Sequence, residues 1–303
     1  MFLKAGIANG LINKAIFTKG VRYLLLSTLC FTVMQALIKY QPKFHSFQHI
    51  FFRSVIGWVF CIIVLLYQRT SLIGKNNSLL IFRGIIGSVS MFCFFYILTN
   101  IPFGSAVAFK YLSPVFTAIF AVFLLKEKIK VLQWFFFLIS FAGVVLLKGF
   151  DTRISFFDVS IGLVSAISGG LLLIIIRKIG DDDHPLVILH YFMMVSAVLS
   201  SIAVIPYWVT PNFNDCLWFL LIGTIGFVAQ LYFTKAIQQP GNEISFLAII
   251  RYTEVLFALL IGYIFFDEIY SAQGFTGIFL IFTGLILSFR LKSKLRKEEI
   301  VEE

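Results

Sequence analysis

Ten apolar runs occupy most of this chain, and each is close to the ~20 residues that an α-helix needs to cross the hydrocarbon core of a bilayer. The runs span residues 21–39, 48–67, 78–98, 104–126, 131–147, 158–177, 187–205, 216–234, 244–266 and 272–290. Apolar residues make up 59% of the 303 residues and charged residues only 13%, which leaves too little polar surface to cover a water-soluble domain. The sequence therefore predicts an all-α polytopic membrane protein with ten transmembrane helices.

The basic residues are distributed unevenly between the predicted loops. With the N-terminus placed in the cytoplasm, 18 Lys and Arg residues, Arg83 among them, fall on the inner side and 4 on the outer side. The positive-inside rule gives this asymmetry for an even number of spans. We therefore interpret the net charge of +10 as a topology signal and expect no nucleic-acid partner. Both termini are expected in the cytoplasm, as an N-terminal segment 1–20 and a C-terminal tail 292–303.

The second half of the chain repeats the first. Residues 105–147 align with residues 246–288 without a gap, at an offset of 141. A Gly-x-x-Gly pair at 84–87 likewise matches one at 223–226, at an offset of 139. Each half then holds five spans, and five is an odd number. The second half is therefore expected to enter the membrane in the opposite sense.

Internal repeats of this kind are typical of secondary transporters, which place the substrate site near the membrane midplane between the repeats. We predict two inverted five-helix repeats, residues 21–150 and 158–291, enclosing a central cavity. A basic residue followed by Tyr recurs within the apolar runs at equivalent places in the two halves, as Lys110-Tyr111 and Arg251-Tyr252. A cation inside the membrane is costly, so it usually has a function. These four residues are predicted to line the cavity and bind substrate.

Glu254 is the one acidic residue near the centre of a predicted span. It follows Arg251 by three residues, so the two share a helix face and can pair. One interpretation is an ion pair that only fixes helix packing. The other is a binding site, in which Lys110 or Arg251 receives an anionic group and Glu254 a cationic group or a proton. Under the second interpretation Glu254 is the candidate for proton coupling.

Other residues inside the runs are weaker candidates. Arg53 either extends to the interface or points into a polar cavity, while Trp58 and Tyr96 either contact substrate or pack in the core. Pro114 predicts a bend in the fourth run, because proline removes a backbone hydrogen bond. Glu268, which follows the ninth run, is expected to cap the helix after it.

Nothing in the sequence indicates catalysis. A phosphate-binding G-x-x-x-x-G-K-[ST] loop, an H-E-x-x-H motif and a spaced Ser/His/Asp set are all absent, so we expect neither an enzyme nor a bound cofactor. The four cysteines show no paired spacing. The acidic string at 181–183 precedes His184 and Pro185, and a solvated turn explains it better than a metal site.

Several motifs recur in a fixed order along the chain. They are Lys39 ending the first run, Arg53 in the second, Ser113-Pro114-Val115-Phe116 in the fourth, Glu127 and Gly143 around the fifth, and the repeats Glu268 and Gly284. With these motifs the chain resembles the EamA family of the drug/metabolite transporter superfamily over almost its whole length. The Arg251-Tyr252-x-Glu254 string looks like a subgroup that contains S-adenosylmethionine carriers and solute carrier 35 G-type proteins. Phe31 and Leu171 stand about where that family usually has Trp.

Repeat, charge pattern and resemblance together predict a secondary transporter of the inner membrane, working as a monomer or homodimer in the lipid bilayer. Its substrate would be a small polar metabolite, zwitterionic or anionic, such as an amino acid or a nucleoside-type metabolite. Transport would proceed by alternating access, either proton-coupled or by exchange. A flippase for a lipid or lipid precursor is the first alternative. A non-transporting membrane sensor or scaffold is the second.

Overall fold

The computed structural model describes residues 19–125, 131–150, 153–179, 182–237, 253–269 and 271–302, and all regular secondary structure in these ranges is helical. Because the spans are apolar, their backbone groups must bond within each helix. The α-helices are α2 (Lys19–Lys39), α3 (Ser46–Tyr67), α4 (Asn77–Asn100), α5 (Phe103–Lys110), α6 (Ser113–Leu125), α7 (Val131–Phe150), α8 (Phe156–Ile179), α9 (Pro185–Ala203), α10 (Phe213–Ile237), α12 (Thr253–Phe266) and α13 (Ala272–Glu302).

Seven segments among the described residues are long and apolar enough to cross a membrane, with α5 and α6 counted together as one. Three shorter apolar stretches accompany them, at Trp134–Gly143, Thr253–Phe266 and Ala272–Gly284. Each predicted run coincides with one of these segments, in whole or in part. The chain is therefore a multi-pass membrane protein, all-α in its described ranges, while the count of ten crossings stays a prediction.

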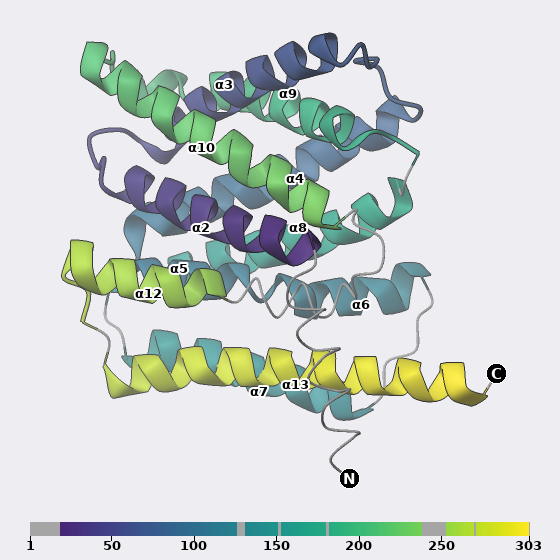
Figure 1. Cartoon of the computed structure of the whole chain (residues 1–303). Helices are drawn as coiled ribbons and strands as arrows, with labels where there is room; N and C mark the ends of the chain where they lie inside the picture. The colour runs from purple at the N-terminus through teal and green to yellow at the C-terminus, as the bar shows by residue number, and fades with distance from the viewer. Residues whose placement is uncertain are drawn as a thin grey trace.

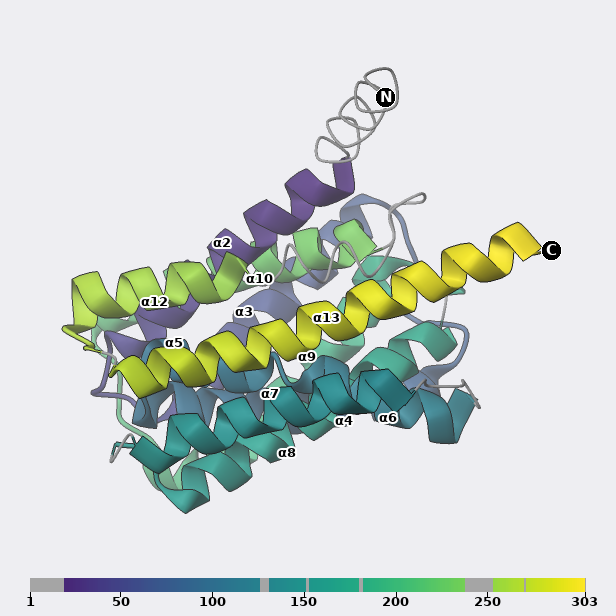
Figure 2. The ribbon, with the colours of Figure 1, turned by 90° about the horizontal axis from the view of Figure 1, so that it is seen from below.

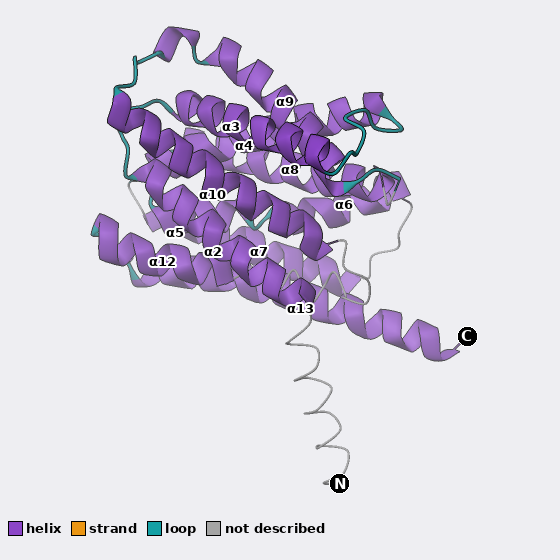
Figure 3. Cartoon of the chain, turned by 45° about the horizontal axis from the view of Figure 1, so that its top comes forward, coloured by secondary structure: helices purple, strands orange, loops and turns teal. Residues whose placement is uncertain are grey.

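The helices lie side by side across the molecule in Figure 1, joined in the described parts by short loops (Figure 3). Helices α7 and α13 pack against each other and form one face of the bundle, at the bottom of Figure 1 and in front in Figure 2. Helix α2 packs on α10, and α4 packs on both α8 and α9. Segments from the two halves of the chain are thus interleaved throughout the bundle.

The fourth apolar run is interrupted in its middle, where α5 ends at Lys110 and α6 begins at Ser113. The amides of Tyr111 and Leu112 bond to carbonyls three residues earlier, at 3.1 and 3.0 Å, as in a 3₁₀ turn. Pro114 has no N–H to reach the Lys110 carbonyl, and the Ser113 hydroxyl donates to that carbonyl instead, at 2.7 Å. The interruption lies where the sequence predicted a bend.

The two halves contact each other through pairs of residues that repeat at the offset of the sequence alignment. A Cβ atom on Gly143 would collide with the backbone of Gly277, and one on Gly284 would collide with the backbone of Phe136. Gly143 and Gly284 are 141 positions apart, as are Phe136 and Gly277. Each contact is therefore the counterpart of the other, and small residues are what permits both.

Reciprocal contacts between equivalent residues also occur elsewhere in the bundle, at an offset of 139. Gly84 lies against Val195, and its equivalent Gly223 lies against Ile56, the equivalent of Val195. Two equivalent surfaces packed on one another produce such reciprocal contacts. The opposite membrane orientation of the two halves is not decided by these contacts and stays a prediction.

Candidate functional site

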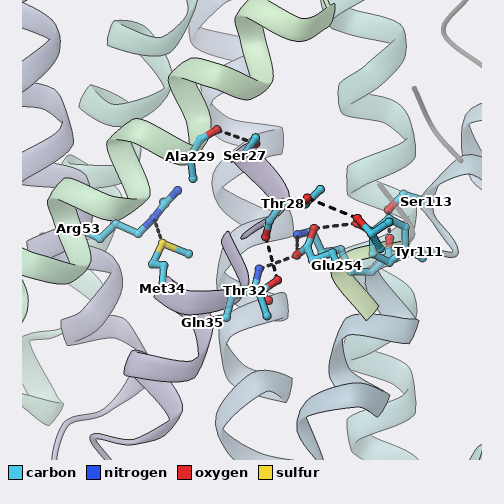
Figure 4. Close-up of polar contacts among 12 residues, drawn as sticks. Ser27, Thr28, Thr32, Met34, Gln35, Arg53, Tyr111, Ser113, Ala229 and Glu254 are labelled. Atoms are coloured by element: carbon cyan, nitrogen blue, oxygen red, sulfur yellow. Dashed lines mark hydrogen bonds and ion pairs between the residues drawn. The ribbon is translucent and has the colours of Figure 1, made fainter. Parts of the chain in front are cut away.

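Glu254 is completely buried at the start of α12 and accepts three hydrogen bonds from side chains. Its Oε1 accepts from Lys110 Nζ at 2.7 Å and from Gln35 Nε2 at 2.8 Å. Its Oε2 accepts from the Tyr111 hydroxyl at 2.7 Å (Figure 4). All three donors belong to the first half of the chain, so this carboxylate joins the two halves.

The interruption between α5 and α6 makes this arrangement possible. Consecutive residues of an uninterrupted α-helix point in directions ~100° apart and do not share a face. The tight turn after Lys110 lets that residue and Tyr111 reach the same carboxylate. The Lys110 ammonium also lies 5.1 Å from the ring centroids of Phe31 and Phe94, where the negative faces of aromatic rings attract a cation.

A cavity of about 180 Å³ adjoins this ion pair, and residues of both halves form its wall. Gln35, Lys110 and Tyr111 line it, whereas Glu254 lies behind them, outside the lining. The other lining residues are Phe31, Met34, Arg53, Arg83, Gly87, Ser90, Met91, Phe94, Phe95, Ser113, Ser165, Gly169, Leu172, Leu173, Ile176, Phe192, Gln230 and Phe233. The wall is mainly apolar and aromatic, with a few charged and hydrogen-bonding groups, as is usual for a small-molecule site.

Arg53 is one of the predicted site residues in this wall, and it is 3% exposed. Its Nε and Nη1 donate to the thioether sulfurs of Met34 and Met91, at 3.3 and 2.7 Å, and its guanidinium carbon lies 5.8 Å from the Phe95 centroid. Figure 4 shows that Met34 of α2 faces Arg53, while the next residue, Gln35, faces Glu254. The sequence left two orientations open for Arg53, and in the structure its side chain points into the cavity rather than to the membrane interface.

Arg83, which the sequence analysis counted among the basic residues of the inner side, also lies in this wall. It is 4% exposed, lines the cavity, and its guanidinium carbon lies 4.5 Å from the Phe192 centroid. The physical reason is depth: Arg83 is the sixth residue of its apolar run, as Arg53 is of its own. This equal depth could have indicated that Arg83 lies in the same cavity wall as Arg53. Gln35 was missed as well, although it too is a polar residue inside an apolar run.

Trp58 and Tyr96, two further predicted contacts, are not among the cavity-lining residues. The Trp58 ring lies 6.2 Å from that of His190, and the Tyr96 ring packs edge-on against Phe157 at 5.8 Å. Both positions fit the packing role that was the alternative interpretation. Arg251 and Tyr252 lie outside the described residues.

Glu268 has a different role from the one expected. Its two carboxylate oxygens accept from the Phe103 amide at 2.8 and 2.7 Å, and it pairs with Lys39 at 3.0 Å. It therefore caps α5 rather than α13, the helix that follows it. Pro102, which precedes α5, offers no side-chain acceptor, so the first amide of α5 takes one from the other half of the chain. The start of α13 uses the Ser271 hydroxyl, which accepts from Gly274 N at 3.1 Å.

Comparison with known proteins identifies the family. The sequence profile of the EamA-like transporter family matches twice, at residues 18–148 and 157–290. This chain belongs to the EamA-like transporter family. The two matches together cover most of the chain, and they confirm the resemblance drawn from the motifs.

Three relatives illustrate the range of this family. The chain is 32% identical to mouse "Solute carrier family 35 member G1", over 82% of this chain and 72% of that protein. It is 25% identical to "Pseudopaline exporter CntI" of Pseudomonas aeruginosa (strain UCBPP-PA14), over 90% and 96%. It is 26% identical to the "S-adenosylmethionine uptake transporter" of Rickettsia prowazekii (strain Madrid E), over 83% and 86%. The first and third agree with the subgroup that the Arg-Tyr-x-Glu string indicated.

A solved crystal structure has the same fold, with a TM-score of 0.62 and 20% sequence identity over 91% of this chain and 97% of the other. The bundle is therefore one already observed experimentally. At this identity the likeness concerns the fold alone.

Proposed function

We propose that this chain is a secondary transporter of the inner membrane, which moves a small polar metabolite by exposing its central cavity alternately to either side. In this proposal the two five-helix halves are inserted in opposite senses, with both termini in the cytoplasm. Support comes from the cavity wall, to which both halves contribute, and from the reciprocal contacts between equivalent glycines. Family membership supports transport itself.

The observation that carries this proposal is the buried pair Lys110–Glu254 at the edge of the cavity. A buried ion pair is by itself weak support for a stabilising role, because desolvation offsets much of the attraction. Here the pair lies at a helix interruption and joins the two halves. In transporters with internal repeats, charged substrate sites typically lie at interrupted helices between the repeats, which move relative to each other during transport.

Proton coupling follows from the chemistry of the carboxylate. When Glu254 takes up a proton, its charge is lost and the attraction that holds Lys110 weakens. Lys110 borders the cavity, so an anionic group of a substrate can then replace the carboxylate as its partner. The short 3₁₀ turn after Lys110 allows α5 and α6 to change their mutual angle without breaking α-helical hydrogen bonds within a span.

The lining of the cavity supports a polar substrate with an apolar part. Aromatic rings at Phe31, Phe94 and Phe233 offer apolar faces, while Gln35 and Lys110 offer donors. Two of the relatives are named for polar metabolites, S-adenosylmethionine and pseudopaline. A zwitterionic or anionic metabolite fits this wall better than an apolar one.

Purified protein in liposomes tests the proposal, with uptake of a metabolite panel measured with and without a pH gradient. We expect uptake of at least one polar metabolite above that of empty liposomes, stimulated by the gradient or by the same metabolite on the far side. Lys110→Ala should reduce this uptake at least tenfold.

The matched control is Lys75→Ala, because Lys75 pairs with Asp182 at 3.2 Å on the exposed surface. It should retain the wild-type rate. Failure of the wild type to move any polar metabolite would contradict transport. Equal rates for the two Lys variants would remove Lys110 from the mechanism and leave the pair as a packing feature.

A further inference from the structure

Two buried arginines line the cavity without an acidic partner in the described part of the chain. Within the described residues, neither Arg53 nor Arg83 has a carboxylate at ion-pair distance, whereas Lys110 is matched by Glu254. The Nε and Nη1 atoms of Arg83 are buried and have no hydrogen-bond partner in the described parts of the chain. The cavity wall therefore carries two positive charges that the described residues do not neutralise.

The contacts that Arg53 and Arg83 do make orient them but leave their charge uncompensated. A thioether sulfur is a weak acceptor, and the rings beside the two guanidinium groups offer only cation–π attraction. A planar guanidinium held in this way still presents paired N–H groups to a carboxylate or phosphate. Burial of such a group without its counter-ion is costly, so its usual explanation in a membrane protein is a ligand.

The two arginines lie at different depths along the cavity. Arg83, Gly87 and Met91 follow one another at four-residue spacing and share one face of α4, and Arg53 contacts Met91. Eight residues of helix correspond to a rise of about 12 Å, so the backbones of Arg83 and Met91 are about two turns apart on that face. Gly87, between them on α4, lines the cavity and lets the Phe192 ring pack close to the helix, since a Cβ there would meet that ring at 3.0 Å.

We propose that Arg53 and Arg83 bind the two ends of an organic dianion, and that the cavity selects a metabolite with two separated anionic groups, such as a dicarboxylate. This rests on the proposed transport function and deepens it. Neutralisation of two fixed charges requires two negative charges on the ligand, and their separation requires these charges at different ends. A monoanion or a zwitterion leaves at least one guanidinium unpaired.

Thermal unfolding of the purified full chain in detergent tests this proposal without relying on flux. The probes are succinate, glutarate and adipate, with butyrate, inorganic phosphate, alanine and lysine for comparison. We expect at least one dicarboxylate to raise the unfolding temperature in a saturable manner, and to bind at least tenfold more tightly than butyrate, alanine or lysine. Equal or weaker binding of every dicarboxylate relative to butyrate would overturn the proposal.

Substitutions separate binding from a structural role. Arg53→Gln and Arg83→Gln should each weaken dicarboxylate binding about 10- to 100-fold, the cost of losing a charged hydrogen-bonding partner. Without ligand, each variant should unfold at the wild-type temperature or above, because an uncompensated buried charge has been removed. Arg22→Gln, on the exposed side of α2, is the matched control and should change neither quantity.

A lower unfolding temperature with unchanged binding would make the arginines structural and overturn the proposal. An anionic lipid headgroup offers similar chemistry, so phosphatidylglycerol is added in a parallel series. Stabilisation by phosphatidylglycerol and by no soluble dicarboxylate would also overturn it. Dicarboxylate binding without any flux would contradict the transport function but support the binding site. Full uptake of a zwitterion by both Gln variants would support the transport function but contradict the dianion site at Arg53 and Arg83.

Discussion

Two buried glutamates of the second half, Glu254 and Glu268, each pair with a lysine of the first half, at 2.7 and 3.0 Å. Their other partners differ. Glu268 accepts the backbone amide of Phe103, at the first residue of α5. Glu254 accepts only side-chain donors among the hydrogen bonds given above, and those donors line the cavity.

This difference separates a fixed contact from one that can be exchanged. Release of Glu268 leaves the N-terminal amide of α5 without its acceptor, which costs stability whatever the side chains do. The three donors to Glu254 named above are side chains, which can change rotamer quickly while the helices stay intact. We therefore propose that the Lys39–Glu268 pair stabilises the fold and that the Lys110–Glu254 pair takes part in transport.

The largest effect is expected at the exchangeable pair. Lys110→Met removes the Lys110 ammonium from the fully buried Glu254 carboxylate and should lower the free energy of unfolding by about 3–5 kcal/mol at neutral pH. Acidification should recover part of this loss, because protonation of Glu254 removes the negative charge that Lys110 no longer balances. Thermal unfolding of the purified protein across a pH series measures both effects.

The double variant Lys110→Met/Glu254→Gln is the control for this result. It removes both charges and should regain most of the stability while transport stays absent. A double variant no more stable than Lys110→Met would contradict a direct coupling between the two residues.

A smaller effect is expected at the fixed pair. Glu268→Ala removes the cap of α5 and the partner of Lys39, and should cost about 2–3 kcal/mol. Hydrogen exchange of the amides at 103–106 should accelerate, because that turn begins to fray. Uptake per folded molecule should stay within about twofold of the wild type. A loss of uptake with unchanged exchange would mean that Glu268 also takes part in transport.

Tyr111→Phe should have the smallest effect, because it removes one of the three donors to Glu254 and leaves the ion pair in place. We expect a loss of about 1.5 kcal/mol in stability and a fall in uptake of about tenfold or less. Tyr263→Phe, at an exposed position of α12, is the matched control and should change neither. If Tyr111→Phe abolished uptake altogether, the hydroxyl would have a role beyond orienting the carboxylate.

Most of the fold could be predicted from the sequence, because membrane spans can be recognised from the length and apolar composition of a run. The alignment at offset 141 indicated which positions are equivalent, and the equivalent Gly143 and Gly284 make equivalent close contacts. The interruption of the fourth run could also be anticipated, because Pro114 removes a backbone donor wherever it is placed.

The site was less predictable, since it depends on which helices become neighbours. Lys110 and Glu254 could be named because each is an ion within an apolar run, yet their pairing required knowing that α5 meets α12. Arg83 was not named as a site candidate, because a charge near the end of an apolar run is equally compatible with a loop and with a cavity wall. Glu268 was misassigned because capping was sought within the same stretch of chain, whereas α5 takes its cap from 165 residues away.

Uptake driven by a pH gradient, measured side by side for Glu254→Gln and Glu268→Gln in liposomes, tests the central claim most directly. Both variants exchange a buried carboxylate for an amide, and both rates are normalised to folded protein. We predict that Glu254→Gln reduces the stimulation of uptake by the pH gradient at least tenfold. Glu268→Gln should keep the wild-type stimulation. A Glu254→Gln variant that responds like the wild type, or an equal loss in the two variants, would contradict the division of roles between these glutamates.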